Sequence, residues 1–176
     1  EAAGRLLDKA TIAYRVLSDD KSRQEYLATL KRDGAATPGE VSPRILADVE
    51  AQKGELALHA KRYQDAMELF DAAIGIYPNE PSYHFKFGLA GYFKAVDETA
   101  ADQQLDDLVR KPFLKAIAID PSYDQARLYL GYISKRNGEY KRALKEFQSA
   151  LDCNPRNRRA QSEVRLLNRR LEMQER

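Results

Sequence analysis

The chain has 176 residues, of which 43% are hydrophobic and 32% are charged, and its formal net charge is +2. A chain of this length forms one domain or two small ones, and its single cysteine, Cys153, excludes a disulfide within the chain. No apolar run approaches the roughly 20 residues that a membrane-spanning helix needs, so we expect no membrane span.

Residues 1–33 have the pattern of a helical hairpin. Ser18 and Asp19 are short polar residues that can cap its second predicted helix, which runs from about Asp20 to Lys31. Apolar side chains form one face of the first helix, and we expect this face to be covered by the rest of the chain, by a second copy in a homodimer, or by solvent alone. These side chains are Leu6, Leu7, Ala10, Ala13, Tyr14 and Leu17.

The segment Ala13–Asp19, followed by Arg23 and Tyr26, resembles the C-terminal part of a J domain, the DnaJ-like co-chaperone module. The resemblance implies the third helix of that module and the short fourth helix after it. The sequence departs from the family at Asp20, where the family usually has proline, and it lacks the His-Pro-Asp loop that engages the DnaK-type chaperone. The resemblance therefore implies a partial J domain that does not stimulate an ATPase. The alternative is a helical hairpin that only shares these residues.

Residues 34–42 contain glycine, proline and threonine without an apolar period, which is typical of a linker. Ser42 and Pro43 then have the pattern of an N-cap followed by proline in the first helical position. We expect the helix that they open to reach about Ala60.

The strongest pattern in the sequence is a set of small and aromatic residues at matching intervals after three glycines. Gly88 lies 34 residues after Gly54, which is the period of the tetratricopeptide repeat (TPR). Gly131 lies 43 residues after Gly88, so about nine residues are inserted in the middle repeat, before Val109. Equal steps from Gly131 and from Gly54 lead to the same residue types, namely Tyr140, Ala143, Phe147, Ala150 and Pro155 in one case and Tyr63, Ala66, Phe70, Ala73 and Pro78 in the other.

At these residues the chain resembles the TPR family, and the resemblance implies an all-α fold. We expect an α-α superhelix of three TPR helical hairpins, at about residues 47–80, 81–123 and 124–157, with a C-terminal capping helix over residues 156–174. This TPR domain would cover residues 43–176, after the J-domain-like hairpin at 1–33 and the linker at 34–42. A stripe in the last helix is predicted to cover the edge of the third repeat. It consists of Ala160, Val164, Leu167 and Leu171.

Pro112 falls inside the second helix of the middle repeat. A helix that began there would be too short to cover the repeat, so we predict a longer helix, from about Asp102 to Ile119, with a kink at Pro112.

We find no catalytic or cofactor-binding pattern. The sequence lacks a glycine-rich phosphate loop, paired metal-ligand histidines and a nucleophile-elbow serine. We therefore expect no enzyme, no cofactor and no metal site. His84 is expected to be a satisfied residue of the helix packing, and His59 is expected near the groove described next.

In stacked TPR hairpins the first helices line a concave groove, and the resemblance implies that a peptide or helix of a protein partner binds there. Aromatic and arginine side chains supply the largest contributions at such interfaces. The alternative is that an N-terminal or C-terminal helix of the chain itself occupies the groove. The predicted groove residues are Glu55, Leu58, His59, Phe85, Leu89, Tyr92, Phe93, Leu128, Tyr132, Lys135, Arg136 and Arg159.

Some TPR proteins hold the acidic C-terminal tail of chaperones with a clamp of two lysines, two asparagines and one arginine. Only one of the matching positions here is basic, and one is acidic, so we expect that this clamp is absent. The matching positions are Ala51, Glu55, Lys86, Gln125 and Tyr129.

The C-terminal residues 156–176 contain seven arginines and three glutamates, a local charge of 7 − 3 = +4. This charge supports a second hypothesis, nucleic-acid binding through the arginine-rich helix, although a solvated helix face is the plainer interpretation. A third hypothesis is self-association through the N-terminal hairpin. Because the sequence begins with Glu1 rather than methionine, we expect it to be part of a longer protein. Our main interpretation is a cytoplasmic protein-interaction adaptor, within a co-chaperone-like parent protein.

Overall fold

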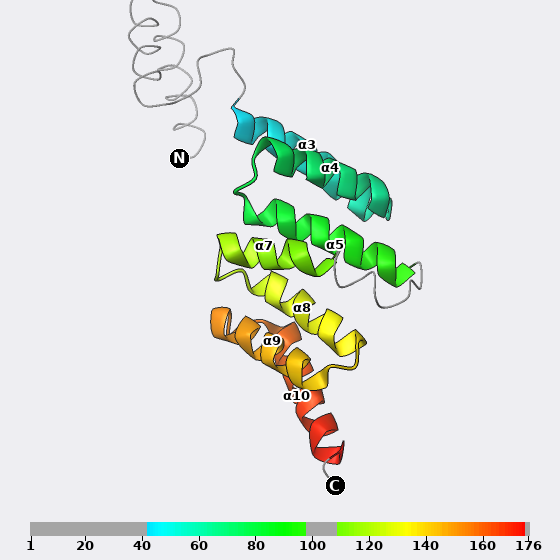
Figure 1. Ribbon diagram of the computed structural model, residues 1–176, viewed down its shortest axis with the longest axis vertical. Helices are drawn as coiled ribbons and strands as arrows, with labels where there is room; N and C mark the ends of the chain where they lie inside the picture. Colours follow the sequence, from blue (N-terminus) through cyan, green and yellow to red (C-terminus); the bar gives the residue numbers. More distant parts are fainter. Residues whose placement is uncertain (1–41, 98–108, 175–176) are drawn as a thin grey trace, which may run out of the picture. The chain divides into compact units, whose positions relative to one another are not determined.

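The computed structural model describes residues 42–97 and 109–174, and the regular structure in these two ranges is entirely helical (Figure 1). The all-α prediction is therefore confirmed for the described residues. The helices are α3 (Pro43–His59), α4 (Tyr63–Ile76), α5 (Pro81–Asp97), α7 (Lys111–Ile119), α8 (Asp124–Arg136), α9 (Tyr140–Cys153) and α10 (Arg158–Gln174).

The helices form three consecutive hairpins, α3 with α4, α5 with α7, and α8 with α9, and α10 packs on α9. Within each hairpin, a glycine of the first helix lies against a phenylalanine of the second. A Cβ atom added at Gly54 would lie 2.8 Å from Cε1 of Phe70, and one added at Gly131 would lie 2.5 Å from Cε1 of Phe147. The glycines thus allow the two helix backbones to approach, and the ring fills the space between them.

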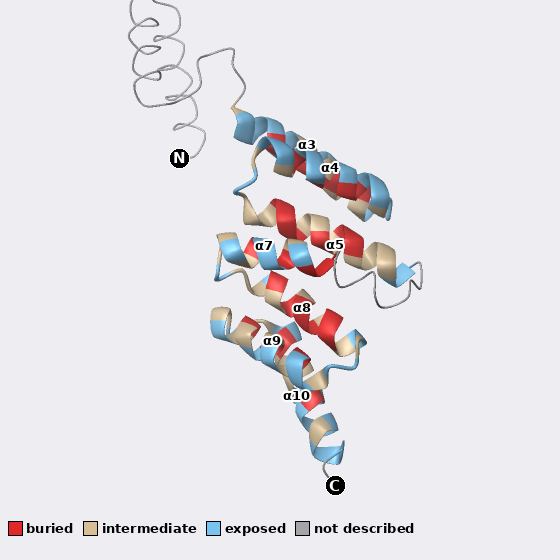
Figure 2. Cartoon of the chain, in the orientation of Figure 1, coloured by how far each residue is buried: buried red, intermediate tan, exposed pale blue. Residues whose placement is uncertain are grey.

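The three phenylalanines at these contacts, Phe70, Phe113 and Phe147, are completely buried. Each contributes about 1.5–3 kcal/mol through the apolar surface that it removes from water. Figure 2 shows that the buried residues lie along the sides of the helices that face their neighbours. Three hydrophobic clusters follow one another along the stack: adjacent hairpins share each of the first two, and the third hairpin shares the third with α10.

The turns between the helices of the first and third hairpins share a left-handed residue at the same position. In the third hairpin this residue is Gly138, with φ of 76°, and the N–H of Glu139 donates to the carbonyl of Ser134 at 2.9 Å. In the first hairpin the position is taken by Lys61, with φ of 59°. The left-handed conformation suits glycine and is costly for lysine, so the two turns have the same geometry at different energies.

The middle hairpin differs from the prediction. The α-helical segment α7 begins at Lys111, so Pro112 lies in its first turn. Val109 and Arg110 form a π-helical turn directly before it. The backbone is therefore helical on both sides of Pro112, as predicted, but the turn before the proline is π-helical rather than α-helical. The earlier part of the predicted helix, at residues 102–108, lies outside the described residues.

The last helix begins two residues later than predicted. Asn157 stands before α10, and its side-chain Oδ1 accepts a hydrogen bond from the N–H of Ala160 at 3.1 Å, which makes Asn157 the N-cap. The predicted stripe of α10 lies on the third cluster, where Ala160 and Leu167 are buried and Val164 is partly buried. The capping role of this helix is confirmed.

The predicted N-terminal hairpin and linker, residues 1–41, lie outside the described residues. No helix in the ranges 42–97 and 109–174 has the length and apolar character needed to cross a membrane.

A cleft between α5, α8 and α10

The candidate site is a cleft of about 470 Å³ that is bounded by α5, α8 and the start of α10. Phe85 and Leu89 of α5 and Leu128 of α8 give it an apolar floor. Its rim is polar and carries charges of both signs. The residues of the rim are Asp124, Gln125, Tyr129, Asn154, Asn157, Arg158 and Arg159.

Tyr129 joins the floor of the cleft to an aromatic cluster. Its ring lies 5.7 Å from that of Phe85, 5.3 Å from that of Tyr92 and 5.6 Å from that of Tyr132, each in an edge-to-face arrangement. It also stacks on Phe113 at 5.7 Å. Edge-to-face pairs are favourable because the positive ring edge meets the negative ring face. The floor is therefore rigid, since the contacts of α5, α7 and α8 hold these rings in place.

The acidic side chain of the rim is already occupied. The carboxylate of Asp124 accepts hydrogen bonds from the side-chain amides of Asn154 and Asn157, both at 2.9 Å. These two bonds attach the turn between α9 and α10 to the first residue of α8. Asp124 therefore shapes the cleft by holding the beginning of α10, and with it the two arginines, above the apolar floor.

The two arginines of the rim are exposed, and neither has a carboxylate partner among the described residues. Burial raises the pKa of the Tyr129 hydroxyl, and the charge of Arg159, together with a hydrogen bond from its side chain, works against this rise. The pKa of Tyr132 is likewise raised by burial and by Glu163, and lowered by Arg159. Arg159 is thus close to the phenols of Tyr129 and Tyr132 and remains exposed.

The predicted groove residues fall into separate groups. Four of them line the cleft: Phe85, Leu89, Leu128 and Arg159. Tyr92, Phe93 and Tyr132 lie around Tyr129 in the aromatic cluster, and Phe93 also stacks on Tyr63 at 6.1 Å.

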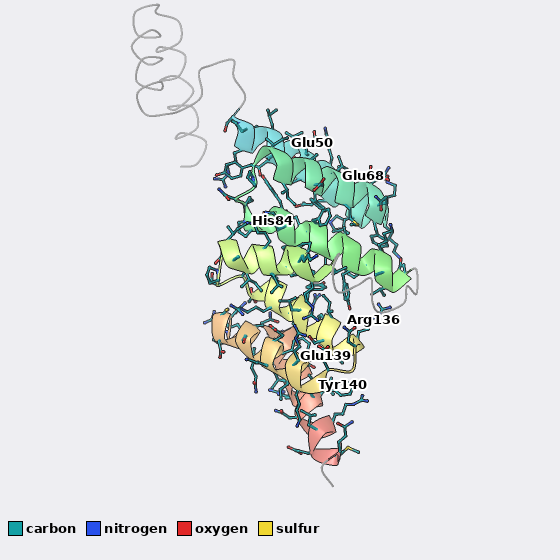
Figure 3. The ribbon with its side chains drawn as sticks, viewed as in Figure 1. Glu50, Glu68, His84, Arg136, Glu139 and Tyr140 are labelled. Carbon is teal, nitrogen blue, oxygen red and sulfur yellow. The ribbon has the colours of Figure 1, made fainter. Side chains whose placement is uncertain are left out.

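The other predicted groove residues lie away from the cleft. Leu58 packs on the first hydrophobic cluster, and His59 is exposed at the end of α3. The ammonium of Lys135 is paired with the carboxylate of Glu163 at 2.5 Å. Arg136 is exposed at the end of α8, and Figure 3 shows it on one side of the turn to α9 with Tyr140 on the other.

Glu55 and Lys86 form an ion pair between α3 and α5, and Tyr83 donates a hydrogen bond to Asp48 between the same helices. Lys86 is the only cation among the five positions that match the family's carboxylate clamp, and its partner Glu55 is another of those positions. Tyr129, a third, is packed among aromatic rings. The ion pair leaves Lys86 with a reduced capacity to hold a ligand's carboxylate.

Several residues of the cleft were missed from the sequence. Asn154, Asn157 and Arg158 belong to the turn and helix after the last repeat, and Asp124 stands at the beginning of α8. In the sequence, the Asn-Pro-Arg-Asn segment at residues 154–157 indicates the end of a helix. Two asparagines beside a proline also indicate a turn with side-chain hydrogen bonds, which is the signal that could have identified these residues.

His84 has a structural hydrogen bond. His84 is buried near the beginning of α5, where Figure 3 labels it, and its Nε2 lies 2.7 Å from the carbonyl oxygen of Pro78. It is therefore a satisfied histidine of the packing, as predicted. Within the described residues, no three His, Cys, Asp or Glu side chains are grouped as metal ligands are.

Residues 46–81 and residues 113–145 each match a family model described as a tetratricopeptide repeat. The chain contains tetratricopeptide repeats. The first match covers the first hairpin with its Gly54–Phe70 contact, and the second covers a segment from α7 to α9 that contains Phe113 and Gly131.

Known TPR proteins resemble this chain over most of its described part. The chain is 30% identical over 118 residues to the small glutamine-rich tetratricopeptide repeat-containing protein 2 of Mycosarcoma maydis, which is 66% of this chain but only 31% of that protein. The TPR domain of Arabidopsis OM64 superimposes with a TM-score of 0.64 at 23% identity, covering 73% of this chain and 98% of that domain. The first TPR of Spaghetti (RPAP3), bound to the HSP90 peptide SRMEEVD, gives a TM-score of 0.62 at 21% identity, covering 72% of this chain and 93% of that one. The likeness to the two solved structures shows that the chain shares their fold, and nothing beyond the fold.

Proposed function

We propose that this TPR domain is a protein-interaction module that binds a peptide segment of a partner protein in the cleft between α5, α8 and α10. The observation that carries the proposal is the combination of an apolar floor, packed against aromatic rings, with exposed arginines that have no carboxylate partner among the described residues. A peptide side chain on the floor gains from burial, while charged groups at the rim select its neighbours. The peptide-bound structure of a TPR domain with the same fold supports this choice of ligand.

An adaptor role within a longer protein is part of the same proposal. The chain spans only 31% of the length of its Mycosarcoma maydis relative, so the function of that whole protein does not carry over. The link to a J domain and to co-chaperones rests on the sequence of residues 13–26 alone, which lie outside the described residues. Cytoplasmic localisation and the absence of enzymatic activity remain predictions from the sequence.

Selection from a displayed library of random peptides tests the proposal. We expect the chain to enrich a consistent peptide motif, and we expect the variant Gln125→Trp to lose these peptides, because Gln125 is exposed on the rim and a tryptophan there fills the cleft. The matched control is Gln148→Trp on α9, which is equally exposed and does not line the cleft. Circular dichroism checks that both variants keep their helices. The proposal fails when no motif is enriched, or when Gln125→Trp and Gln148→Trp bind the selected peptides equally well.

A further inference from the structure

The charges around the cleft define which peptide it accepts. Among the basic residues near the cleft and the aromatic cluster, Lys135 is paired with Glu163 and Lys86 with Glu55. Arg158 and Arg159 line the cleft, are exposed, and have no carboxylate partner among the described residues. The positive charge that lines the cleft is therefore at its α10 side.

The opposite sides of the cleft disfavour an acidic group. The floor, formed by Phe85, Leu89 and Leu128, is apolar, and a carboxylate placed on it loses its hydration without a hydrogen-bond donor. Asp124 at the α8 side is itself acidic, and its Oδ2 accepts hydrogen bonds from Asn154 and Asn157. A ligand thus finds an apolar region beside α5 and a region for anions beside α10.

We propose that the cleft binds an internal peptide segment in which an apolar side chain is followed or preceded by acidic ones. The apolar side chain lies on the floor, and the acidic ones bind Arg158 and Arg159. This inference rests on the proposed function and names its ligand class. It also predicts that recognition does not require a free C-terminus, because the positions that match the terminal-carboxylate clamp hold a neutralised lysine, a glutamate, a glutamine, an alanine and a packed tyrosine.

The planar guanidinium group makes this assignment specific. Arginine donates paired hydrogen bonds to a carboxylate, and such charge-assisted bonds are shorter and stronger than neutral ones. Loss of one such interaction weakens binding by about tenfold or more.

The test uses the peptide SRMEEVD as an acidic and partly apolar probe, labelled with a fluorophore, in three forms. One form has a free C-terminus, one is amidated, and one is amidated with its acidic residues replaced by their amides. We expect the first two forms to bind within about threefold of each other and the third to bind about tenfold or more weakly, as measured by fluorescence anisotropy. Binding of the amidated acidic form should weaken as ionic strength rises, because salt screens exposed charges.

The matched variants are Arg159→Ala at the cleft and Arg165→Ala, which removes an equally exposed arginine from α10 away from the cleft. We expect the first to weaken binding of the amidated acidic peptide by about tenfold and the second to leave it unchanged. The inference is overturned when the free carboxylate is required, when neutralised and acidic peptides bind equally, when no form binds, or when both variants lose equal affinity. In each of these cases a motif from the peptide library that is lost with Gln125→Trp would still establish the cleft as a peptide site.

Discussion

Replacement of Gly131 by alanine tests the contact that builds each hairpin. The new Cβ would lie 2.5 Å from Cε1, 2.7 Å from Cδ1 and 2.8 Å from Cζ of Phe147, and real Cβ atoms essentially never approach other atoms so closely. Phe147 is completely buried, so its ring cannot move aside without displacing other core residues. Overpacking of this kind costs about 1–3 kcal/mol.

Helix propensity opposes this cost. Alanine in place of a helical glycine stabilises a helix by about 0.5–1 kcal/mol. The clash is the larger effect, so we expect Gly131→Ala to lower the free energy of unfolding by about 1–2 kcal/mol, measured by urea unfolding monitored by circular dichroism. The clash distances at the equivalent glycines are 2.8 Å for Gly54 and 3.0 Å for Gly88, which predicts progressively smaller losses at these two positions.

Gly75 provides the matched control. It lies in α4, and a Cβ there would meet no atom within 4 Å, so Gly75→Ala should raise stability by up to about 1 kcal/mol. The double variant of Gly131→Ala with Phe147→Leu should be more stable than the sum of the single effects, since the smaller side chain makes room for the methyl group. Stability of Gly131→Ala at or above that of the unmodified chain would refute the packing argument, and an equal loss in Gly75→Ala would assign the effect to the backbone.

Two further predictions concern a strained turn and a buried phenol. Lys61→Gly should raise the free energy of unfolding, measured in urea, by about 0.5–1 kcal/mol. The left-handed conformation costs a lysine about 1–2 kcal/mol, and the greater entropy of glycine in the unfolded state offsets part of the gain. A loss of stability would contradict this account. Burial, with Glu80, Asp120 and Asp124 nearby, raises the pKa of Tyr123 from its ordinary value of 10.0 to about 12. Because the folded chain holds this proton more tightly than the unfolded chain, the resulting stabilisation is complete below pH 10 and is lost as the pH rises towards 12. Tyr123→Phe should therefore show a shallower fall of stability in alkaline solution, and an unchanged fall would show that other groups cause it.

The repeat pattern predicted most helix boundaries in the described part of the chain. The intervals after Gly54 and Gly131 placed α4 and α9 within a residue or two, because each interval combines a helical period with a cross-helix contact. The helix was predicted to pass through Pro112, but the π-helical form of the turn before it, at Val109 and Arg110, was not predicted. A π-helical turn before α7 has no recognisable signal in a single sequence.

The candidate site was only partly predictable. Helical offsets from the glycines identified Phe85, Leu89 and Leu128 as residues of the cleft, because equal steps along equivalent helices reach equivalent surfaces. The same offsets also selected Lys135, which is paired with Glu163 from a different helix. An ion pair between helices far apart in the sequence depends on how the helices stack, and no periodicity records it.

The sequence by itself determined the hairpins and their order, because glycine and phenylalanine at fixed intervals leave one close packing for each pair of helices. Only the tertiary structure decided which charges remain available. It joins Lys86 to Glu55, attaches the turn before α10 to Asp124, and leaves Arg158 and Arg159 exposed above an apolar floor. Electrostatic pairing depends on distances of a few ångström between separate helices, and these distances arise only when the hairpins stack.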